Sequence, residues 1–238
     1  MENSLEILPE DWERAIAVVA HPDDLEYGAA AAVARWTNQG KDVRYVLATR
    51  GEAGIDSMPP AEVGPLRTRE QESSAAVVGV SSVEFLDHPD GLLVNGIELR
   101  RDLAAAIRRH QPEVIIASNY RLQWYDGGPW NHADHRALGQ ALPDAVRDAS
   151  NRWLFPDSGQ PWAGVRWIAY TASTSPTHGV DVTDWLQAGV DSLKCHHTYL
   201  EALGDPDFDP EQFLRSAATG AGAKLGVDLA VAFEMVPT

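Results

Sequence analysis

Cysteine is almost absent from this chain of 238 residues, in which Cys195 is the only one. A single cysteine excludes an intramolecular disulfide and a cysteine-based zinc ribbon. Basic residues are also scarce, because 19 Lys and Arg stand against 35 Asp and Glu, which gives a formal net charge of −16. A surface this acidic disfavours nucleic acid and anionic lipid as partners.

Long apolar runs are missing too. No stretch approaches the roughly 20 apolar residues that a transmembrane helix needs. The acidic start of the chain, MENSLEILPEDWER, lacks the apolar region of a signal peptide. We therefore expect a soluble, cytoplasmic protein without a membrane partner. Because no repeat, low-complexity tract or linker interrupts the sequence, we predict a single domain over residues 1–238.

Short apolar runs alternate with helical patterns along most of the chain, which is typical of an α/β protein. Two long loops are predicted, over Arg50–Gly64 and Asn119–Asn131. Strands are predicted over Ala15–Ala20, Val43–Ala48, Ser82–Leu86, Val114–Ser118, Val165–Thr171 and Leu229–Met235. Helices are predicted over Gly28–Gln39, Pro65–Val78, Ile97–Arg109, Ala133–Ala149, most of Val182–Leu203 and a segment near Glu211–Ala218.

This alternation predicts a Rossmann-like, doubly wound and mostly parallel sheet with helices on both faces. In the expected strand order 3-2-1-4-5, the first and fourth strands are neighbours and the winding reverses between them. Ligands of such sheets bind at that point, outside the carboxyl ends of the strands. Polar residues that directly follow the first or the fourth strand are therefore candidates for a functional site.

Both places carry histidine and aspartate. The first strand is followed by the sequence HPDD (21–24), and the loop after the fourth strand ends in HADH (132–135). Two imidazoles and one carboxylate are sufficient to hold a catalytic zinc ion. If one aspartate of the first cluster binds the ion, the other is placed to act as a base. Taken singly, the aspartates could instead cap a helix, and the histidines could lie on the surface; two such clusters at one switch point favour the functional interpretation.

These clusters resemble the motifs of the PIG-L/LmbE-like family of zinc-dependent N-acetylglucosamine deacetylases. The resemblance covers about residues 15–140 and includes further motifs. They are Thr49-Arg50-Gly51-Glu52, the pair Arg67 and Glu70 followed by Ala75, Ala76 and Gly79, the turn Pro89-Asp90-Gly91, and Pro112-Glu113-Val114. Two patterns depart from the family: Leu25 separates HPDD from Glu26, and a late motif is only partly present at Lys194 and His197-Thr198-Tyr199.

The resemblance implies a role for each matching residue. One Zn²⁺ ion per chain would be bound by His21, Asp24 and His135, and Asp23 would be the general base. His132 would stabilise the oxyanion in protonated form, with Asp134 orienting it. Arg67 and Asp90 would contact sugar hydroxyls, although an exposed helix arginine and a turn aspartate are equally good interpretations. The implied reaction is hydrolysis of the amide bond of a sugar acetamide, in which the leaving amine would take a proton from Asp23 or His132.

The loop between the fourth strand and HADH is predicted to contribute to substrate specificity. Trp124, Tyr125 and Trp130 offer flat faces for a sugar ring or an aromatic aglycone, and Gly127-Gly128 would allow a lid to move. Packing of these tryptophans against the body is the alternative. Together with the acidic net charge, the aromatic loop favours a neutral or cationic N-acetylglucosaminide as substrate. A natural-product glycoside, for instance a glycopeptide antibiotic precursor, is of this kind.

Three other functions stay open at this point. A mycothiol- or bacillithiol-type precursor is the alternative substrate of a deacetylase. A non-haem Fe(II) oxygenase also uses two histidines and a carboxylate, and a sugar-binding module without catalysis would not need Asp23. A homo-oligomer is possible on this sequence.

Overall fold

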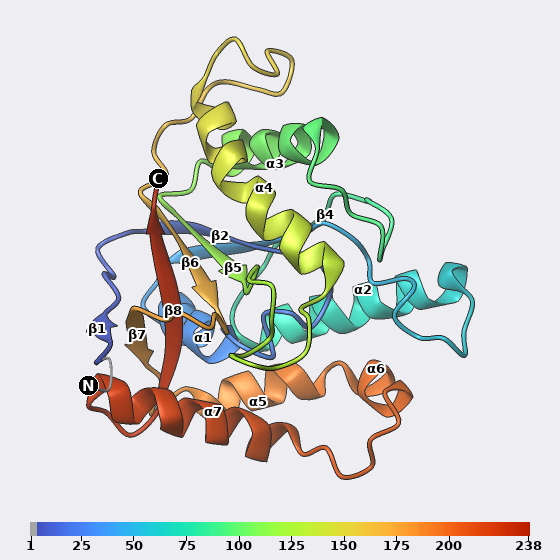
Figure 1. The fold of residues 1–238 in the computed structure, drawn as a ribbon, viewed down its shortest axis with the longest axis vertical. Coiled ribbons are helices and arrows are strands. Elements are labelled where there is room, and N and C mark those ends of the chain that lie inside the picture. Colours follow the sequence, from blue (N-terminus) through green and yellow to red (C-terminus); the bar gives the residue numbers. More distant parts are fainter. Residues whose placement is uncertain (1–3) are drawn as a thin grey trace.

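The central feature of the computed structural model, which describes residues 4–238, is one sheet of eight strands with the order β1-β7-β8-β6-β5-β2-β3-β4 (Figure 1). The strands are β1 (Glu6–Ile7), β2 (Arg14–Val19), β3 (Asp42–Leu47), β4 (Val83–Phe85), β5 (Val114–Ser118), β6 (Trp167–Thr171), β7 (His178–Asp181) and β8 (Ala230–Pro237). The run β4-β3-β2-β5-β6 is parallel throughout. The predicted order 3-2-1-4-5 is therefore confirmed.

Helices cover both faces of the sheet. They are α1 (Ala30–Asn38), α2 (Pro60–Val77), α3 (Ile97–His110), α4 (Ala133–Ser150), α5 (Leu186–Lys194), α6 (His197–Ala202) and α7 (Pro210–Leu225). In Figure 1, α3 and α4 lie on one side of the sheet, and α1, α2, α5 and α7 lie on the other. No helix within residues 4–238 combines the length and the apolar character that crossing a membrane requires.

Strand β2 shows how the sequence produces two cores. Successive side chains of a strand point to opposite faces. Ala15, Ala17 and Val19 pack with α1 in one core, whereas Ile16 and Val18 pack with α3 and α4 in the other. A strand buried on both faces shows no alternation of polar and apolar residues, and the apolar sequence AIAVV that follows the exposed Arg14 is of this kind. The residues after β2 consequently leave the sheet at its centre.

Two predicted boundaries were wrong by five residues or more. The loop expected over Arg50–Gly64 ends earlier, because α2 begins at Pro60, and Pro65 lies inside this helix. A proline at the first helical position lacks an N–H that would have had no partner there anyway. The C-terminal helix is longer than Glu211–Ala218 and continues to Leu225, where Gly226 adopts a left-handed φ of 85° and ends it.

The chain after β6 differs most from expectation. The segment Val182–Leu203 is divided into α5 and α6, and β8 runs antiparallel to both β6 and β7. Two short strands were not predicted: β7, and β1, which pairs with it in parallel. Strands of two and four residues contain too few positions for a period to be recognised. The sheet thus continues beyond β6 through the antiparallel strand β8 to β7 and β1.

Candidate active site

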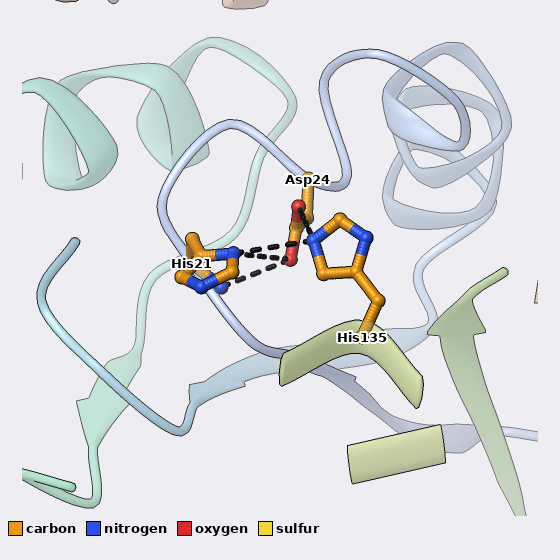
Figure 2. Close-up of side chains that lie close together, drawn as sticks. All are labelled: His21, Asp24 and His135. Atoms are coloured by element: carbon orange, nitrogen blue, oxygen red, sulfur yellow. Dashed lines mark hydrogen bonds and ion pairs between the residues drawn. The ribbon is translucent and has the colours of Figure 1, made fainter. Parts of the chain in front are cut away.

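The two histidine–aspartate clusters meet at the carboxyl ends of β2 and β5, which are neighbouring parallel strands. His21 and Asp24 come from the turn after β2, and His135 comes from the first turn of α4 (Figure 2). One ligand atom of each of these three side chains lies within 4.8 Å of the others. The structure therefore brings together the three residues that the sequence suggested as metal ligands.

The donor atoms of this triad face one another. Nε2 of His135 lies 2.8 Å from Oδ1 of Asp24 and 3.2 Å from Nδ1 of His21. Nδ1 of His21 lies 3.7 Å from Oδ2 of Asp24. Two ring nitrogens and a carboxylate converging in this way form a donor set that suits zinc.

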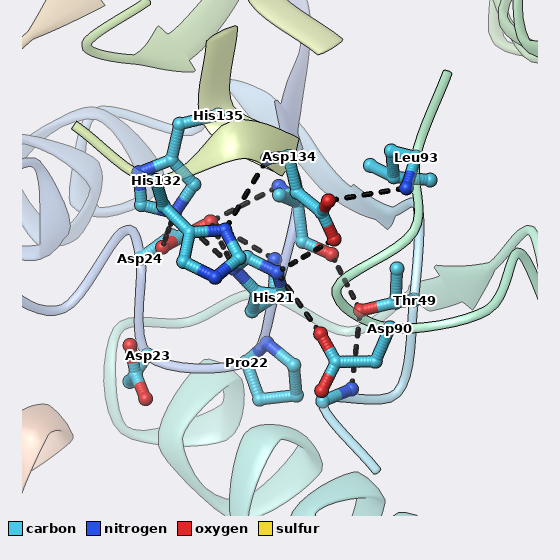
Figure 3. Close-up of polar contacts among 12 residues, drawn as sticks. His21, Pro22, Asp23, Asp24, Thr49, Asp90, Leu93, His132, Asp134 and His135 are labelled. Atoms are coloured by element: carbon cyan, nitrogen blue, oxygen red, sulfur yellow. Dashed lines mark hydrogen bonds and ion pairs between the residues drawn. The ribbon is translucent and has the colours of Figure 1, made fainter. Parts of the chain in front are cut away.

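The opposite nitrogen of each ring is held by another side chain. Nε2 of His21 lies 3.1 Å from Oδ1 of Asp90 and 3.2 Å from Oδ2 of Asp134, and Figure 3 shows His21 among these carboxylates and Asp24. Nδ1 of His135 lies 3.1 Å from Oδ1 of Asn131. Such contacts fix the tautomer and orientation of a metal-ligating histidine. The two rings are thus arranged to present Nδ1 of His21 and Nε2 of His135 to a cation.

The charges around His21 also fit a cation. Burial alone would lower the pKa of His21, but the carboxylates of Asp134, Asp24 and Asp90 raise that pKa well above its ordinary value. Burial would raise the pKa of Asp24, yet His135 and His21 hold it well below its usual range. Oδ2 of Asp24 also accepts hydrogen bonds from the backbone N–H groups of Ala20 and His21, at 3.0 and 2.9 Å. The site concentrates carboxylate charge around two imidazoles, as a metal centre requires.

Asp23 has different surroundings from Asp24. Its backbone adopts a φ of 78°, in the left-handed region, and its carboxylate forms a buried ion pair with Arg67. Burial raises the pKa of Asp23 to about 6 although Arg67 lowers it. A carboxyl group with a raised pKa that lines the same cavity as the triad is suited to accept a proton from water.

Arg67 is buried on α2, so the interpretation as an exposed helix arginine was wrong. Besides its ion pair with Asp23, its guanidinium donates hydrogen bonds to the carbonyl oxygens of Pro22 (2.7 Å) and Gly51 (3.2 Å). The guanidinium also lies 3.9 Å from the centre of the Tyr199 ring. These contacts make Arg67 a partner of Asp23 and the surrounding backbone. Because Arg67 also lines the cavity, the expected contact to sugar hydroxyls stays a prediction.

Asp90 likewise has protein partners. Its Oδ1 contacts His21, and its Oδ2 accepts a hydrogen bond from the backbone N–H of Ala53 at 2.8 Å. The expected contact to a sugar hydroxyl stays a prediction, since Asp90 does line the cavity. His197, from the partly matching late motif, has a side chain that is 71% exposed and lies 3.3 Å from Glu70.

His132 and Asp134 do not interact as the resemblance implied. The carboxylate of Asp134 contacts His21 and accepts hydrogen bonds from the backbone N–H groups of Gly91 (2.8 Å) and Leu93 (3.1 Å). His132 caps α4, because its Nδ1 accepts the backbone N–H of Asp134 at 3.2 Å. Asp134 therefore orients His21, since the loop before α3 supplies backbone donors at its position.

The protonated state expected for His132 is not favoured either. Burial, together with the neighbouring His21 and His135 rings, lowers the pKa of His132. An imidazole whose Nδ1 accepts a hydrogen bond is neutral and carries its proton on Nε2. His132 lines the cavity in this form and can donate one hydrogen bond from Nε2.

A cavity of about 650 Å³ opens over the triad, a volume typical of small-molecule sites. Trp124 and Tyr125 line it, and the Trp124 ring lies edge-to-face on His135 with 5.1 Å between centroids. Trp130 lies elsewhere, against the guanidinium of Arg136 at 5.4 Å, so the structure brings two of the three loop aromatics to the cavity.

Further aromatic side chains of the wall were missed by the sequence analysis. They are Tyr27, Tyr199 and Phe213. Tyr27 and Phe213 lie edge-to-face, with 5.7 Å between centroids. Tyr199, on α6, lies in the partly matching late motif, but no role was assigned to it there. Phe213 comes from α7, beyond the region of motif resemblance, and no local pattern distinguishes it from a core aromatic.

Asn131 was also missed. It is buried, and its Oδ1 accepts hydrogen bonds from both the backbone of His132 (2.7 Å) and the ring of His135. The only signal in the sequence was its position directly before HADH. Asn131 connects the long loop to His135, a candidate metal ligand.

Comparison with known proteins agrees with this geometry. The family model PIG-L, described as GlcNAc-PI de-N-acetylase, matches residues 16–146, which is more than half of the chain and includes both clusters. The chain belongs to the PIG-L family. The family model and the first curated relatives are named for N-deacetylation, so this PIG-L protein is an enzyme of the N-deacetylase class.

Two curated relatives show how far the likeness extends. Diacetylchitobiose deacetylase of Thermococcus kodakarensis is 25% identical over 95% of this chain and 84% of its own. A 1D-myo-inositol 2-acetamido-2-deoxy-alpha-D-glucopyranoside deacetylase of Streptomyces avermitilis is 28% identical over 65% of this chain, and the match spans 60% of that relative. The likeness to the first relative thus extends beyond the PIG-L region into the C-terminal part.

The fold is shared with solved structures. N,N'-diacetylchitobiose deacetylase from Pyrococcus horikoshii superimposes with a TM-score of 0.85 at 26% identity, covering 96% of this chain and 85% of its own. The conserved protein TT1542 from Thermus thermophilus superimposes with a TM-score of 0.77 at 26% identity, over 94% and 95% of the two chains. A teicoplanin deacetylase, at 12% identity and a TM-score of 0.68, shares the fold.

Proposed function

We propose that this protein hydrolyses the N-acetyl group of an N-acetylglucosamine unit in a small glycoconjugate, with one zinc ion per chain. The observation that carries the proposal is the convergence of His21, Asp24 and His135 in a cavity that the buried carboxylate of Asp23 also lines. A bound zinc ion would supply a Lewis acid for the acetamide carbonyl and would acidify a water molecule.

The protein residues divide the proton transfers among them. Asp23 accepts a proton from the attacking water, whose oxygen bonds to the acetyl carbon. The carbon–nitrogen bond then breaks, and Asp23 delivers its proton to the nitrogen, which leaves a free amine and acetic acid that ionises to acetate on release. Arg67 holds the carboxylate of Asp23 in place throughout.

His132 stabilises the oxygen of the acetyl carbonyl as negative charge develops on it. The neutral ring offers its Nε2–H, because Nδ1 accepts the backbone N–H of Asp134. Hydrogen bonds to a developing oxyanion contribute on the order of a hundredfold or more to the rate. Asp134 contributes indirectly, since its carboxylate holds His21.

The aromatic wall supports a substrate with a group beyond the reacting sugar. Trp124, Tyr125, Tyr27 and Phe213 present flat apolar faces around the cavity, and such faces stack well on sugar rings. The likeness to a diacetylchitobiose deacetylase over 95% of the chain favours a second sugar as that group. The net charge of −16 disfavours strongly anionic substrates.

A panel of acetylated substrates tests the proposal. Zinc-loaded protein is incubated with N,N'-diacetylchitobiose, free N-acetylglucosamine, an inositol-linked N-acetylglucosamine, an N-acetylated glycopeptide glycoside and the phosphatidylinositol-linked sugar. Mass spectrometry then follows loss of acetyl. We expect the disaccharide to react fastest and the anionic lipid slowest. Preference for the glycopeptide glycoside would favour a natural-product substrate, and preference for the inositol sugar a mycothiol-type precursor.

Two carboxylate variants test the assignment of roles. Asp23→Asn should retain zinc and lower kcat by at least about a hundredfold, since an amide cannot accept the proton. Asp24→Asn should lose zinc instead, because a carboxylate ligand is removed. The opposite pattern in metal analysis would mean that the two roles are exchanged. Oxygen consumption with added Fe(II) and a keto acid, without loss of acetyl, would instead favour an oxygenase.

A further inference from the structure

A cluster of polar side chains is buried beneath Asp23, away from the metal triad. It consists of Glu26, Gln71, Ser74, Ser192 and His196, which we call the Glu26 cluster; each is at most 1% exposed. Glu26 follows the turn that carries His21 and Asp24, Gln71 and Ser74 lie on α2, and Ser192 lies on α5. Buried polar groups cost free energy unless they are paired, so the contacts within this cluster are informative.

Gln71 connects the cluster to Asp23 by two hydrogen bonds. Its Oε1 accepts the backbone N–H of Asp23 at 3.0 Å, and its Nε2 donates to Oε1 of Glu26 at 2.9 Å. The N–H of Asp23 requires an acceptor and the carboxylate of Glu26 requires a donor, so only one of the two amide orientations satisfies both. Glu26 therefore determines which end of Gln71 faces Asp23.

The backbone of Asp23 needs such support. Its φ of 78° lies in the left-handed region, which non-glycine residues occupy only when their surroundings hold them there. Arg67 and Gln71 are four residues apart on α2 and lie on the same face of that helix. Arg67 holds the carboxylate of Asp23, and Gln71 holds its backbone. One helix face thus fixes Asp23 at both ends.

We propose that Gln71 is a positioning residue for Asp23, and that Glu26 acts through it by fixing the orientation of its amide. This inference rests on the proposed function, in which Asp23 is the base. Loss of the hydrogen bond lets the backbone of Asp23 relax and moves its carboxylate away from the reacting water. Displacements of this size lower turnover more than they lower substrate binding.

Packing of α2 against α5 is the competing explanation, and Ser192 offers a matched control. Its hydroxyl lies 2.8 Å from Oγ of Ser74 and donates to the carbonyl oxygen of Ser74 at 3.1 Å. Ser192→Ala removes hydrogen bonds from the same buried cluster and leaves both contacts of Gln71 intact. If the Glu26 cluster only stabilised the packing of α2 against α5, Ser192→Ala and Gln71→Met would lower kcat equally.

The experiment compares four variants: Gln71→Met, Gln71→Glu, Ser192→Ala and the exchange Glu26→Gln/Gln71→Glu. In the exchange, the amide at position 26 donates to the carboxylate at position 71, which still accepts the N–H of Asp23. For Gln71→Met we expect kcat on N,N'-diacetylchitobiose to fall at least about tenfold, with KM and zinc content unchanged. Ser192→Ala should keep the kcat of the parent, and the exchange should recover turnover relative to Gln71→Glu.

Hydrogen exchange of the Asp23 amide, followed by NMR, supplies a readout that does not depend on activity. Hydrogen exchange at the Asp23 amide should be faster in Gln71→Met than in the parent and unchanged in Ser192→Ala. A parent protein that removes no acetyl group would refute the proposed function and leave this readout as the test. Three results would each overturn the role of Gln71. They are equal kcat in Gln71→Met and Ser192→Ala, an unchanged rate of hydrogen exchange at the Asp23 amide in Gln71→Met, and a kcat of the double variant Glu26→Gln/Gln71→Glu no higher than that of Gln71→Glu.

Discussion

Substitution of Asn131 by alanine should lower both the metal affinity and the fold stability of this protein, because its side chain contacts both His135 and the long loop. The side chain of Asn131 accepts hydrogen bonds from the backbone of His132 and the ring of His135, at 2.7 and 3.1 Å. It donates two more, to the carbonyl oxygens of Asn119 (2.6 Å) and Arg121 (3.1 Å). Four bonds at about 1 kcal/mol each give a loss of unfolding free energy of about 4 kcal/mol.

The effect on the metal follows from the bond to His135 alone. Loss of such a partner of a ligating histidine lowers metal affinity about 10- to 100-fold, or about 1.4 to 2.7 kcal/mol. Competition titrations with a zinc chelator at pH 7 measure the affinity, and thermal unfolding with chelator present measures the stability of the metal-free protein. We expect Asn131→Ala to weaken both.

Asn119→Ala is the matched control. Asn119 is buried in the same loop, where its side chain donates to the carbonyl oxygen of Gln123 (3.1 Å) and accepts the N–H of Arg121 (2.9 Å). Loss of this side chain should lower the unfolding free energy by about 2 kcal/mol. Zinc affinity should stay within about twofold of the parent, a difference below about 0.5 kcal/mol, because the bonds of this side chain are to Gln123 and Arg121. Equal zinc affinity in the Asn131 and Asn119 variants would refute the reasoning, because loop order rather than the bond to His135 would then control the metal.

Three further predictions concern the metal, the cavity wall and acid stability. Chelation should abolish deacetylation, and Zn(II) or Co(II) should restore it; full activity in verified metal-free protein would contradict the zinc assignment. Trp124→Ala should lower kcat/KM for the disaccharide more than for free N-acetylglucosamine, whereas Trp130→Ala, outside the cavity, should change neither. A hydrogen bond from His110 lowers the pKa of Glu84 despite partial burial. The ionised Glu84 therefore stabilises the folded state at pH values above its unfolded-state pKa. This stabilisation is lost as the pH falls through the lowered folded-state pKa. Unfolding between pH 3 and 6 should therefore be less pH-dependent in Glu84→Gln, and identical slopes would show that Glu84 contributes nothing.

Residues that act within their own segment could be predicted from the sequence. The strand Val114–Ser118 was predicted with its observed bounds, because an apolar run between Pro112 and a polar loop leaves few alternatives. The positions of His21, Asp24 and His135 at one edge of the sheet followed from the strand order, since parallel strands end at the same edge. The roles within the triad came from motif resemblance; the geometry brings the three side chains together, and their roles as metal ligands stay predictions.

Contacts between distant segments were not readable in this way. Arg67 was interpreted as either exposed or substrate-binding, and its burial against Asp23 depends on how α2 crosses the turn after β2. The carboxylate of Asp134 found backbone donors at Gly91 and Leu93, which the chain brings there from a loop more than 40 residues earlier. Such partners are decided by tertiary packing, because no local pattern encodes which loop will cover a side chain.

The sequence by itself determined the order of the central strands, the two clusters of ligands and the acidic surface, since these depend on local periodicity, on chain order and on composition. The tertiary structure alone decided which atoms of those ligands face one another, which carboxylate holds which histidine, and which aromatic rings form the wall. Tyr199 and Phe213 illustrate the difference. Their rings reach the cavity only because α6 and α7 pack beside the turn after β2, and the free energy of that packing is a property of the folded chain as a whole.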